Sequence, residues 1–328
     1  MSDDSIGWHV FQSEVQAFHP YESRASRIEA DGPGEVQTSA MPNAPLVPTV
    51  RRRRLGMTLR QLRNQAGLTL DEAATIVGWK APKMSKIENA TLGVRPTDLL
   101  RLLDVYSVDD SEARAALESL SRDAGRRGWW QTYSGIVSPS YADFISLESD
   151  AEKISSWSPL LVPGLLQTPS YARETIAGIT TTRSPEEVAA LAEVRMARQS
   201  VLTRPSPRME LWTIIHEAAL HQRFAARTAT MREQLRRLLD TSEMPNVTVQ
   251  LMPMTSTVHP GLLGGFSLAT FAKPLSEVVV LENLTGAAYV EGEDTAPYAL
   301  AFQHIQATAL SVEDSLVRIA EMEEGLRK

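Results

Sequence analysis

The sequence predicts a multidomain protein in which an all-helical domain comes first, followed by a mainly helical connecting segment and a mixed α+β domain. Three observations predict this order. Apolar residues recur at three- and four-residue steps in residues 51–128, as on the buried face of a helix. Pro139, Pro159, Pro163 and Pro169 break the helical pattern of residues 129–205, and β-rich runs alternate with helical ones in residues 206–328.

Composition limits the class of protein in three ways. Residues 1–50 are acidic, poorly periodic and rich in Pro, Ser and Glu, so we expect a disordered tail. The chain of 328 residues has no cysteine, which excludes disulfides and thiolate metal sites and fits a cytoplasmic location. No apolar run approaches the ~20 residues that span a bilayer, so we expect no membrane association.

Residues 55–90 carry the most specific local pattern. Leu55, Leu59 and Leu62 share one helix face, and Gly67 ends that helix where a left-handed residue is favoured. Thr69 and Glu72 form a Thr-x-x-Glu capping box, which predicts a second helix from residue 70.

A third helix follows a tight turn at Gly78. Pro82 suits the first turn of this helix, because its missing N–H has no partner there. Met84 and Ile87 then point inward, which leaves lysines and a serine facing outward: Lys83, Ser85 and Lys86. Lysine binds guanine edges or phosphates, and amides at a helix start bind phosphate. The alternative is a helical hairpin with a solvated lysine face, but the full order of signals favours DNA binding.

The segment resembles the XRE/Cro-type helix-turn-helix, whose recognition helix commonly runs into an Ile/Leu-x-Glu-Asn-Gly ending. This chain has Ile87-Glu88-Asn89-Ala90, with Ala in place of the final Gly. The resemblance implies that Asn89 contacts phosphate and that Ala81, Pro82 and Lys86 face bases; Lys80, Lys83 and Ser85 complete the predicted surface. Glutamine is common in the family where Leu70, Ala81 and Pro82 stand here, so base readout is expected to depend on Lys83, Ser85 and Lys86.

Charge supports the same interpretation. Residues 51–90 hold nine Lys or Arg against three acids, whereas the whole chain carries a net charge of −7. A basic island on an acidic chain is typical of a nucleic-acid-binding module. Arg51, Arg52, Arg53 and Arg54 immediately precede the expected first helix. Such an arm can follow the DNA backbone or enter a minor groove; the alternative is a charged run that only aids solubility.

The remaining elements follow from local signals. Pro96 opens a helix whose Leu99, Leu100, Leu102 and Leu103 close the small core, and a further helix is expected over residues 110–124. Strands are predicted at 209–216, 246–253, 266–272 and 277–283, and helices at 217–226 and 230–240. Ser311 and Asp314 cap a final helix that runs to about residue 326.

A second resemblance lies in residues 156–173, which contain VPGLLQTPSYAR. This run is similar to the VPGLLQT-x-x-YAR hallmark of an actinobacterial family that pairs an XRE domain with a C-terminal domain of unknown function. Its members are often described as antitoxin-like regulators and include WhiJ-like proteins. The resemblance implies a small partner protein encoded next to the regulator. From the residues alone, the segment is either a structural joint or a loop that binds a partner or ligand.

No catalytic constellation is recognisable. His216-Glu217-Ala218-Ala219-Leu220-His221 is similar to a zinc motif, but its histidines are five residues apart, and at ~100° per residue they do not share a helix face. There is no phosphate-binding glycine loop and no Gly-x-Ser-x-Gly elbow. Aromatic residues such as Trp157, Trp212 and Tyr171 line either a core or a ligand pocket. We therefore expect no enzyme, metal or cofactor.

These observations predict a sequence-specific DNA-binding transcriptional regulator whose C-terminal domain binds a small partner protein or ligand. The alternative is an antitoxin-like protein that mainly sequesters its small partner and binds DNA for autoregulation. The expected partners are double-stranded DNA, that neighbouring-gene protein and a second copy of the chain, because paired motifs read a palindrome. The dimer contacts are expected after residue 129, at an exposed-edge strand over 277–283 and the helix over 311–326.

Overall fold

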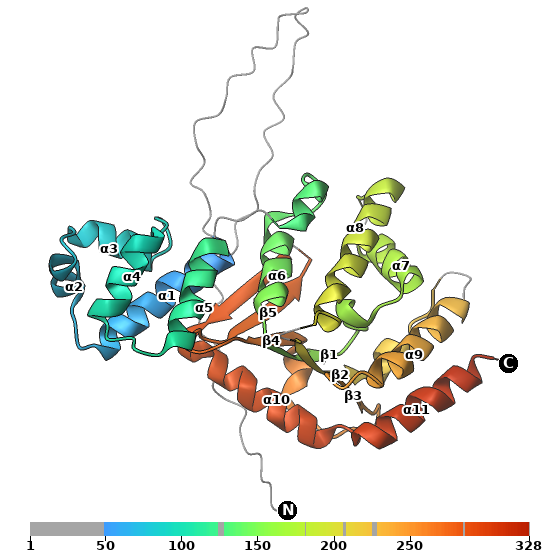
Figure 1. Ribbon diagram of the computed structural model, residues 1–328. Coiled ribbons are helices and arrows are strands. Elements are labelled where there is room, and N and C mark those ends of the chain that lie inside the picture. The colour runs from blue at the N-terminus through green and yellow to red at the C-terminus, as the bar shows by residue number, and fades with distance from the viewer. Residues whose placement is uncertain are drawn as a thin grey trace, which may run out of the picture. The chain divides into compact units, whose positions relative to one another are not determined.

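The computed structural model describes residues 49–123, 128–180, 182–205, 208–224, 228–284 and 286–327 (Figure 1). Of the predicted tail, only Thr49 and Val50 lie within these ranges. An all-helical region comes first along the chain, and a six-stranded mixed sheet with helices on both faces follows. The predicted fold class is therefore confirmed. None of the described helices is both long and apolar enough to cross a membrane.

Five helices make up the N-terminal region: α1 (Val50–Gln65), α2 (Leu70–Ile76), α3 (Ala81–Glu88), α4 (Pro96–Val105) and α5 (Ser111–Asp123). The local signals act as expected. Gly67 and Gly78 both have φ +70°, which ends α1 and α2. Thr69 and Glu72 form the complete capping box at the start of α2.

The core of this region is small and mainly aliphatic. Its buried members include Leu59, Met84, Leu99, Leu102 and Leu103, each with at most 1% of its surface exposed. Leu100, expected in the same core, is 38% exposed, because α4 turns that position towards solvent.

Gly56 allows the close approach of α1 and α3. A Cβ atom built on Gly56 lies 2.5 Å from the Glu88 carbonyl oxygen and 2.7 Å from that of Ile87. No side chain fits at this crossing, although nothing in the helical pattern of the sequence marks Gly56 as special.

The sheet has the strand order β3-β2-β1-β4-β5-β6. Strands β1, β2 and β3 are parallel to each other, whereas β4, β5 and β6 continue the sheet in antiparallel pairs. Their bounds are β1 Lys153–Ser158, β2 Glu210–His216, β3 Val247–Met252, β4 Phe266–Thr270, β5 Val278–Asn283 and β6 Gly286–Glu291.

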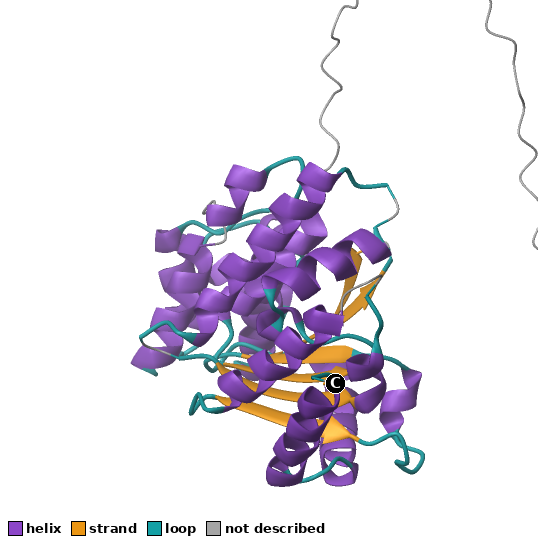
Figure 2. Cartoon of the chain, turned by 90° about the vertical axis from the view of Figure 1, so that its right-hand side faces the viewer, coloured by secondary structure: helices purple, strands orange, loops and turns teal. Residues whose placement is uncertain are grey.

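Helices cover both faces of this sheet (Figure 2). One face packs mainly on α6 (Pro139–Asp150), α9 (Thr228–Ser242) and α11 (Val312–Gly325), and the other face packs on α10 (Ala296–Thr308). Strand β5 shows the alternation: Val278 and Val280 belong to the first core, and Val279 belongs to the second. Helices α7 (Pro169–Ile179) and α8 (Pro185–Arg198) pack on each other beside α9.

The four predicted strands and the cap at Ser311 are confirmed. The segment 129–205 is not only helical, however, because it supplies β1 in the middle of the sheet. The run KISSWS gave no strand signal because three of its residues are serines. In the fold Ser156 is buried, and its hydroxyl bonds that of Thr213 at 2.8 Å.

Two further expectations were wrong. In the described part of the helix predicted over 217–226 there is only a 3₁₀ turn, Glu217–His221, because the Ala218 amide donates to His216 Nδ1 and ends the strand in a local cap; residues 225 and 226 lie outside the described residues. Strand β5 is not an edge, since it lies between β4 and β6. The sheet ends at β6 and at β3. The edge of β3 is covered, because the Leu310 amide donates to the Leu251 carbonyl and the Leu251 amide donates to the Ser315 hydroxyl.

Candidate nucleic-acid interface

Helix α3 presents most of the predicted DNA-contacting residues on its outer side. Lys80, Pro82, Lys86 and Asn89 are exposed, whereas Ala81, Lys83 and Ser85 are half-buried. Met84 and Ile87 anchor the inner side in the core, as the spacing predicted. Lys80 is the N-cap residue and makes no side-chain cap. Pro82 has no N–H, and the Lys83 amide donates to the Lys80 carbonyl at 2.9 Å, so the start of α3 offers few free amides.

Lys83 is less available than the sequence suggests. Its Nζ lies 3.1 Å from Asp98 Oδ2 and 3.6 Å from the centre of the Trp79 ring. Ser85 is partly engaged as well, since Asn89 Nδ2 donates to its hydroxyl at 3.2 Å. Lys80 and Lys86 have no acid within ion-pair distance among the described residues, so they carry the unpaired positive charge of this surface.

Arg51–Arg54 do not form an arm ahead of the first helix, because α1 begins at Val50 and includes them. Arg51 donates from Nε and Nη2 to the Asp150 carboxylate at 2.8 and 2.6 Å. Its Nη1 donates to the Asp123 carbonyl at 3.2 Å. Arg51 therefore joins α1 to the ends of α5 and α6, and its guanidinium is not directed at a free surface.

Arg53 and Arg54 also face the sheet domain. Arg53 lies over the Tyr289 ring, with Nε 3.8 Å from Glu291 Oε1. Arg54 is 3% exposed and stacks on the Phe271 ring, and burial lowers its pKa to about 10. Arg52, at the same end of α1, is half-buried.

Four of the nine cations in the basic island pair with acids outside it. Partners for its cations come from Asp98, Asp150 and Glu291, all beyond residue 90. Arg63 pairs inside the island, with Glu88. Arg60, Lys80 and Lys86 remain exposed, so few charges of this region are available to phosphates.

The VPGLLQT segment forms a buried joint between the sheet and the helices beside it. Val162, Leu165 and Leu166 belong to the main core. The Gln234 side chain from α9 accepts from the Thr168 amide and donates to the Leu166 carbonyl, both at 2.8 Å. A role as a structural joint is therefore sufficient to explain why these residues are present.

Further glutamines and a tyrosine hold the same segment. Gln167 donates to the Val162 carbonyl at 2.7 Å, and Gln199 donates to the Gln167 carbonyl at 2.7 Å. The Val162 amide donates to the Tyr171 hydroxyl at 3.1 Å. Tyr171 and Trp157 are core residues, at 0% and 2% exposure, so their burial explains these aromatics without a ligand.

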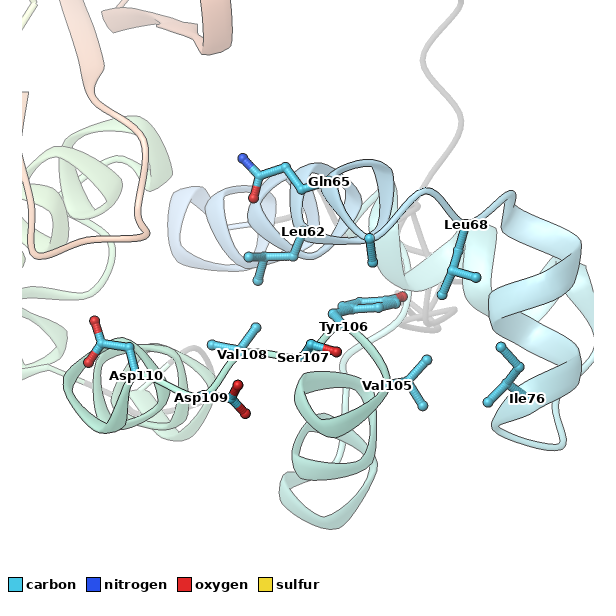
Figure 3. A pocket seen from close by; sticks show the side chains of 11 residues that line it. Leu62, Gln65, Leu68, Ile76, Val105, Tyr106, Ser107, Val108, Asp109 and Asp110 are labelled. Carbon is cyan, nitrogen blue, oxygen red and sulfur yellow. The ribbon is translucent and has the colours of Figure 1, made fainter.

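A groove of about 630 Å³ lies between α1, α2 and the α4–α5 connection (Figure 3). Its wall combines apolar side chains such as Leu62, Ile76 and Val105 with Asp109 and Asp110. No residue of α3 lines it, and its charged side chains are acidic. This groove is therefore unsuited to phosphate and is separate from the α3 surface.

The His216–His221 region is built for packing. Arg318 of α11 donates from Nε and Nη2 to Glu217 Oε1 at 2.9 and 2.6 Å, and the Met254 amide donates to Glu217 Oε2. In the described part of the chain, no group of three or more His, Cys, Asp or Glu residues is arranged to hold a metal ion.

Two families match this sequence. The helix-turn-helix domain family matches residues 54–117, and the family described as domain of unknown function DUF5753 matches residues 141–321. No curated protein and no solved structure matches the chain. The second match covers more than half of the 328 residues. The chain therefore belongs to the DUF5753 family and carries a helix-turn-helix domain ahead of the family's characteristic domain.

Proposed function

We propose that this protein is a sequence-specific transcriptional regulator that places α3 in the DNA major groove. The observation that carries the proposal is the outer side of α3, where Lys80, Lys86 and Asn89 are exposed on a helix whose inner side is fixed by Met84 and Ile87. An exposed lysine at this place bonds guanine O6 or N7, or a phosphate.

The charge pattern limits how the protein holds DNA. Because Arg51, Arg53, Arg54 and Arg63 pair with acids, we leave them out of the DNA-contacting set. Arg60, Lys80 and Lys86 remain exposed. Each phosphate contact contributes a slope of about −0.9 to the dependence of log affinity on log salt. We therefore expect a shallow salt dependence per motif, on the order of −2 to −3.

The C-terminal domain is proposed to bind a small protein partner. Five large apolar side chains support this part: Leu160, Met254, Val258, Leu262 and Leu263 are 59–97% exposed. They lie on loops that meet at the ends of β1 and β3, where Gly265 packs against Pro159 and Trp157 Nε1 donates to the Gly261 carbonyl at 2.8 Å. Exposed apolar groups gathered on one set of loops are typical of a protein-binding surface.

The same loops support the second candidate function, an antitoxin-like protein that mainly sequesters its partner. The resemblance of the sequence to XRE-type, antitoxin-like actinobacterial regulators also supports this candidate. The two functions differ in which event matters for the cell: a regulator changes promoter occupancy when the partner binds, whereas a sequestering protein neutralises the partner without any DNA.

Binding of the full chain to promoter DNA from its own locus tests the DNA-binding proposal, with fluorescence anisotropy measured from about 50 to 200 mM salt. If Lys86 reads a base, Lys86→Ala should cost ~1–3 kcal/mol and relax preference at one operator position. Lys80→Ala should weaken all sequences and reduce the salt slope by about one. Arg173→Ala on α7 removes an exposed charge away from α3 and is the matched control.

Equal effects of Lys86→Ala and Arg173→Ala would show that α3 is not the reading helix. Binding of the neighbouring gene's product, with and without Leu263→Ser, tests the partner. If that product binds both proteins equally, the apolar loops are not its site, and the DNA-binding proposal is unaffected.

A further inference from the structure

Strand β6 is the last strand of the sheet, and no described strand pairs with its second edge. It pairs with β5 alone, and Asn283 lies opposite Gly286 across a two-residue turn. In such a hairpin the flanking pair exchanges hydrogen bonds, and bonded and non-bonded pairs then alternate. The backbone groups of Ala287, Tyr289 and Glu291 therefore point away from β5. Within the described ranges, no residue bonds these backbone groups.

Side chains on both faces of β6 make contacts within the fold, although Ala288 is exposed, and the strand is open along its edge. On one face the Tyr289 hydroxyl donates to the Ser140 carbonyl of α6, and Arg53 of α1 lies over the Tyr289 ring. On the other face Val290 packs with the α10 side of the sheet. The strand GAAYVE has no proline or lysine, the residues that usually protect a free edge, whereas the β3 edge is closed by the α10–α11 connection.

We propose that β6 pairs with β6 of a second copy of this chain, antiparallel, so that the sheet continues across a two-fold axis. Outward-facing residues must pair with outward-facing residues, which allows Tyr289 to face Tyr289 of the second copy. Glu291 then faces Ala287 of the second copy, and no like charges are opposed. This register gives about six backbone hydrogen bonds between the copies.

The geometry favours a second copy over an unrelated extended peptide. In an antiparallel pair, the side chains of opposed residues lie on the same face of the sheet. Because Tyr289 opposes Tyr289, both copies carry α1 on the same face of the shared sheet. Arg53 of α1 contacts Tyr289 and Glu291, which places the base of each helix-turn-helix domain beside the shared edge. Two reading helices on one side match what a palindromic site requires. The biological role of this dimer rests on the proposed DNA-binding function, whereas pairing of the two β6 edges does not require DNA.

Sedimentation equilibrium of the full chain tests the interface. The wild type should be a dimer of the 36.1 kDa chain at micromolar concentration. Ala287→Pro removes an outward N–H and should raise the dimer Kd at least about tenfold while the melting temperature changes little. Ala288→Pro removes an N–H that bonds β5, so it should instead lower the melting temperature. Amide exchange at residues 287, 289 and 291 should slow as the wild type dimerises.

Three outcomes would overturn the inference: a monomeric wild type, an unchanged dimer Kd in Ala287→Pro, or loss of the dimer in Leu263→Ser. Slow exchange at these amides in a monomer, abolished by removing residues 1–40, would assign the edge to the chain's own N-terminal segment. The proposed function is judged separately, because an Ala287→Pro monomer should still bind one half-site in a manner that depends on Lys86. Absence of DNA binding by a wild-type dimer would remove the function and leave the interface.

Discussion

The Arg63 guanidinium and the Glu88 carboxylate form a buried pair that joins α1 to α3. Arg63 Nε lies 2.7 Å from Glu88 Oε1, and Nη2 lies 3.0 Å from Oε2. Arg63 Nη1 also donates to the Leu68 carbonyl at 2.7 Å, which ties in the turn before α2. The two side chains are 8% and 3% exposed. A planar, two-point contact of this kind fixes the direction of α3 as well as its distance from α1.

Removing either partner of this pair should be strongly destabilising. Glu88→Ala leaves the Arg63 charge buried without a counter-charge, and such losses cost about 3–5 kcal/mol. The double variant Arg63→Met/Glu88→Leu replaces both charges by apolar groups and should recover most of that loss. Urea unfolding of the helix-turn-helix region, followed by circular dichroism, measures the free energies. Equal losses in the single and double variants would contradict a role based on charge pairing.

Gly56→Ala should loosen the same helix crossing. The new Cβ would meet two backbone carbonyl oxygens of α3 at 2.5 and 2.7 Å, so α3 must move, at a cost of about 1–3 kcal/mol. The matched control is Gly178→Ala near the end of α7, where nothing lies within 4 Å of the added atom. That change should stabilise by about 0.5–1 kcal/mol, because alanine favours helix. Thermal unfolding compares them, and a neutral Gly56→Ala would refute the close approach.

The sequence predicted those features whose cause is local. Gly67, the Thr69–Glu72 box and the Ser311 cap each act within four residues, so the pattern contains the whole interaction. The core positions Met84 and Ile87 followed from helical spacing in the same way.

Features that depend on distant partners could not be predicted. Arg51 binds Asp150, 99 positions away, so a run of arginines looked like a free basic arm. Strand β1 lies in the middle of the sheet between β2 and β4, where buried Ser156 bonds Thr213 of β2, and a serine-rich run carries no sign of that partner. The ion pair between Lys83 and Asp98 also depends on tertiary structure. Because this pair occupies Lys83, the expected DNA contacts shift towards Lys80 and Lys86.

Arg51 and Arg54 should differ in their contributions to stability although they are three residues apart. Arg51→Met breaks the two-point contact with Asp150 and the bond to the Asp123 carbonyl, which should cost about 2–3 kcal/mol. Arg54 is buried on Phe271, and this burial disfavours the charged guanidinium and lowers its pKa to about 10. Arg54→Met keeps the apolar contact and should change stability by less than about 1 kcal/mol. Urea unfolding of the full chain decides this, and equal losses would contradict it.

Glu217 should make stability depend on pH. Burial alone would raise the pKa of its carboxyl, but the bonds from the Met254 amide and Arg318 outweigh burial and hold the pKa below its ordinary value of 4.5. The unfolded chain then binds this proton more tightly than the folded one. The stabilisation from Glu217 is therefore complete above pH 4.5 and is lost as the pH falls through that value and the lower folded pKa.

Glu217→Gln measures this contribution directly. The wild type should exceed the variant in free energy of unfolding at pH 7, and the difference should shrink steadily below about pH 4.5 as the carboxyl takes up its proton. Arg318→Met is the partner control: it removes the main side-chain donor and should leave a smaller, less pH-dependent effect of Glu217→Gln. Urea titrations at several pH values between 3.5 and 7 provide the comparison. A difference that grows towards acid pH would mean that burial outweighs the hydrogen bonds and raises the pKa of Glu217 in the folded protein.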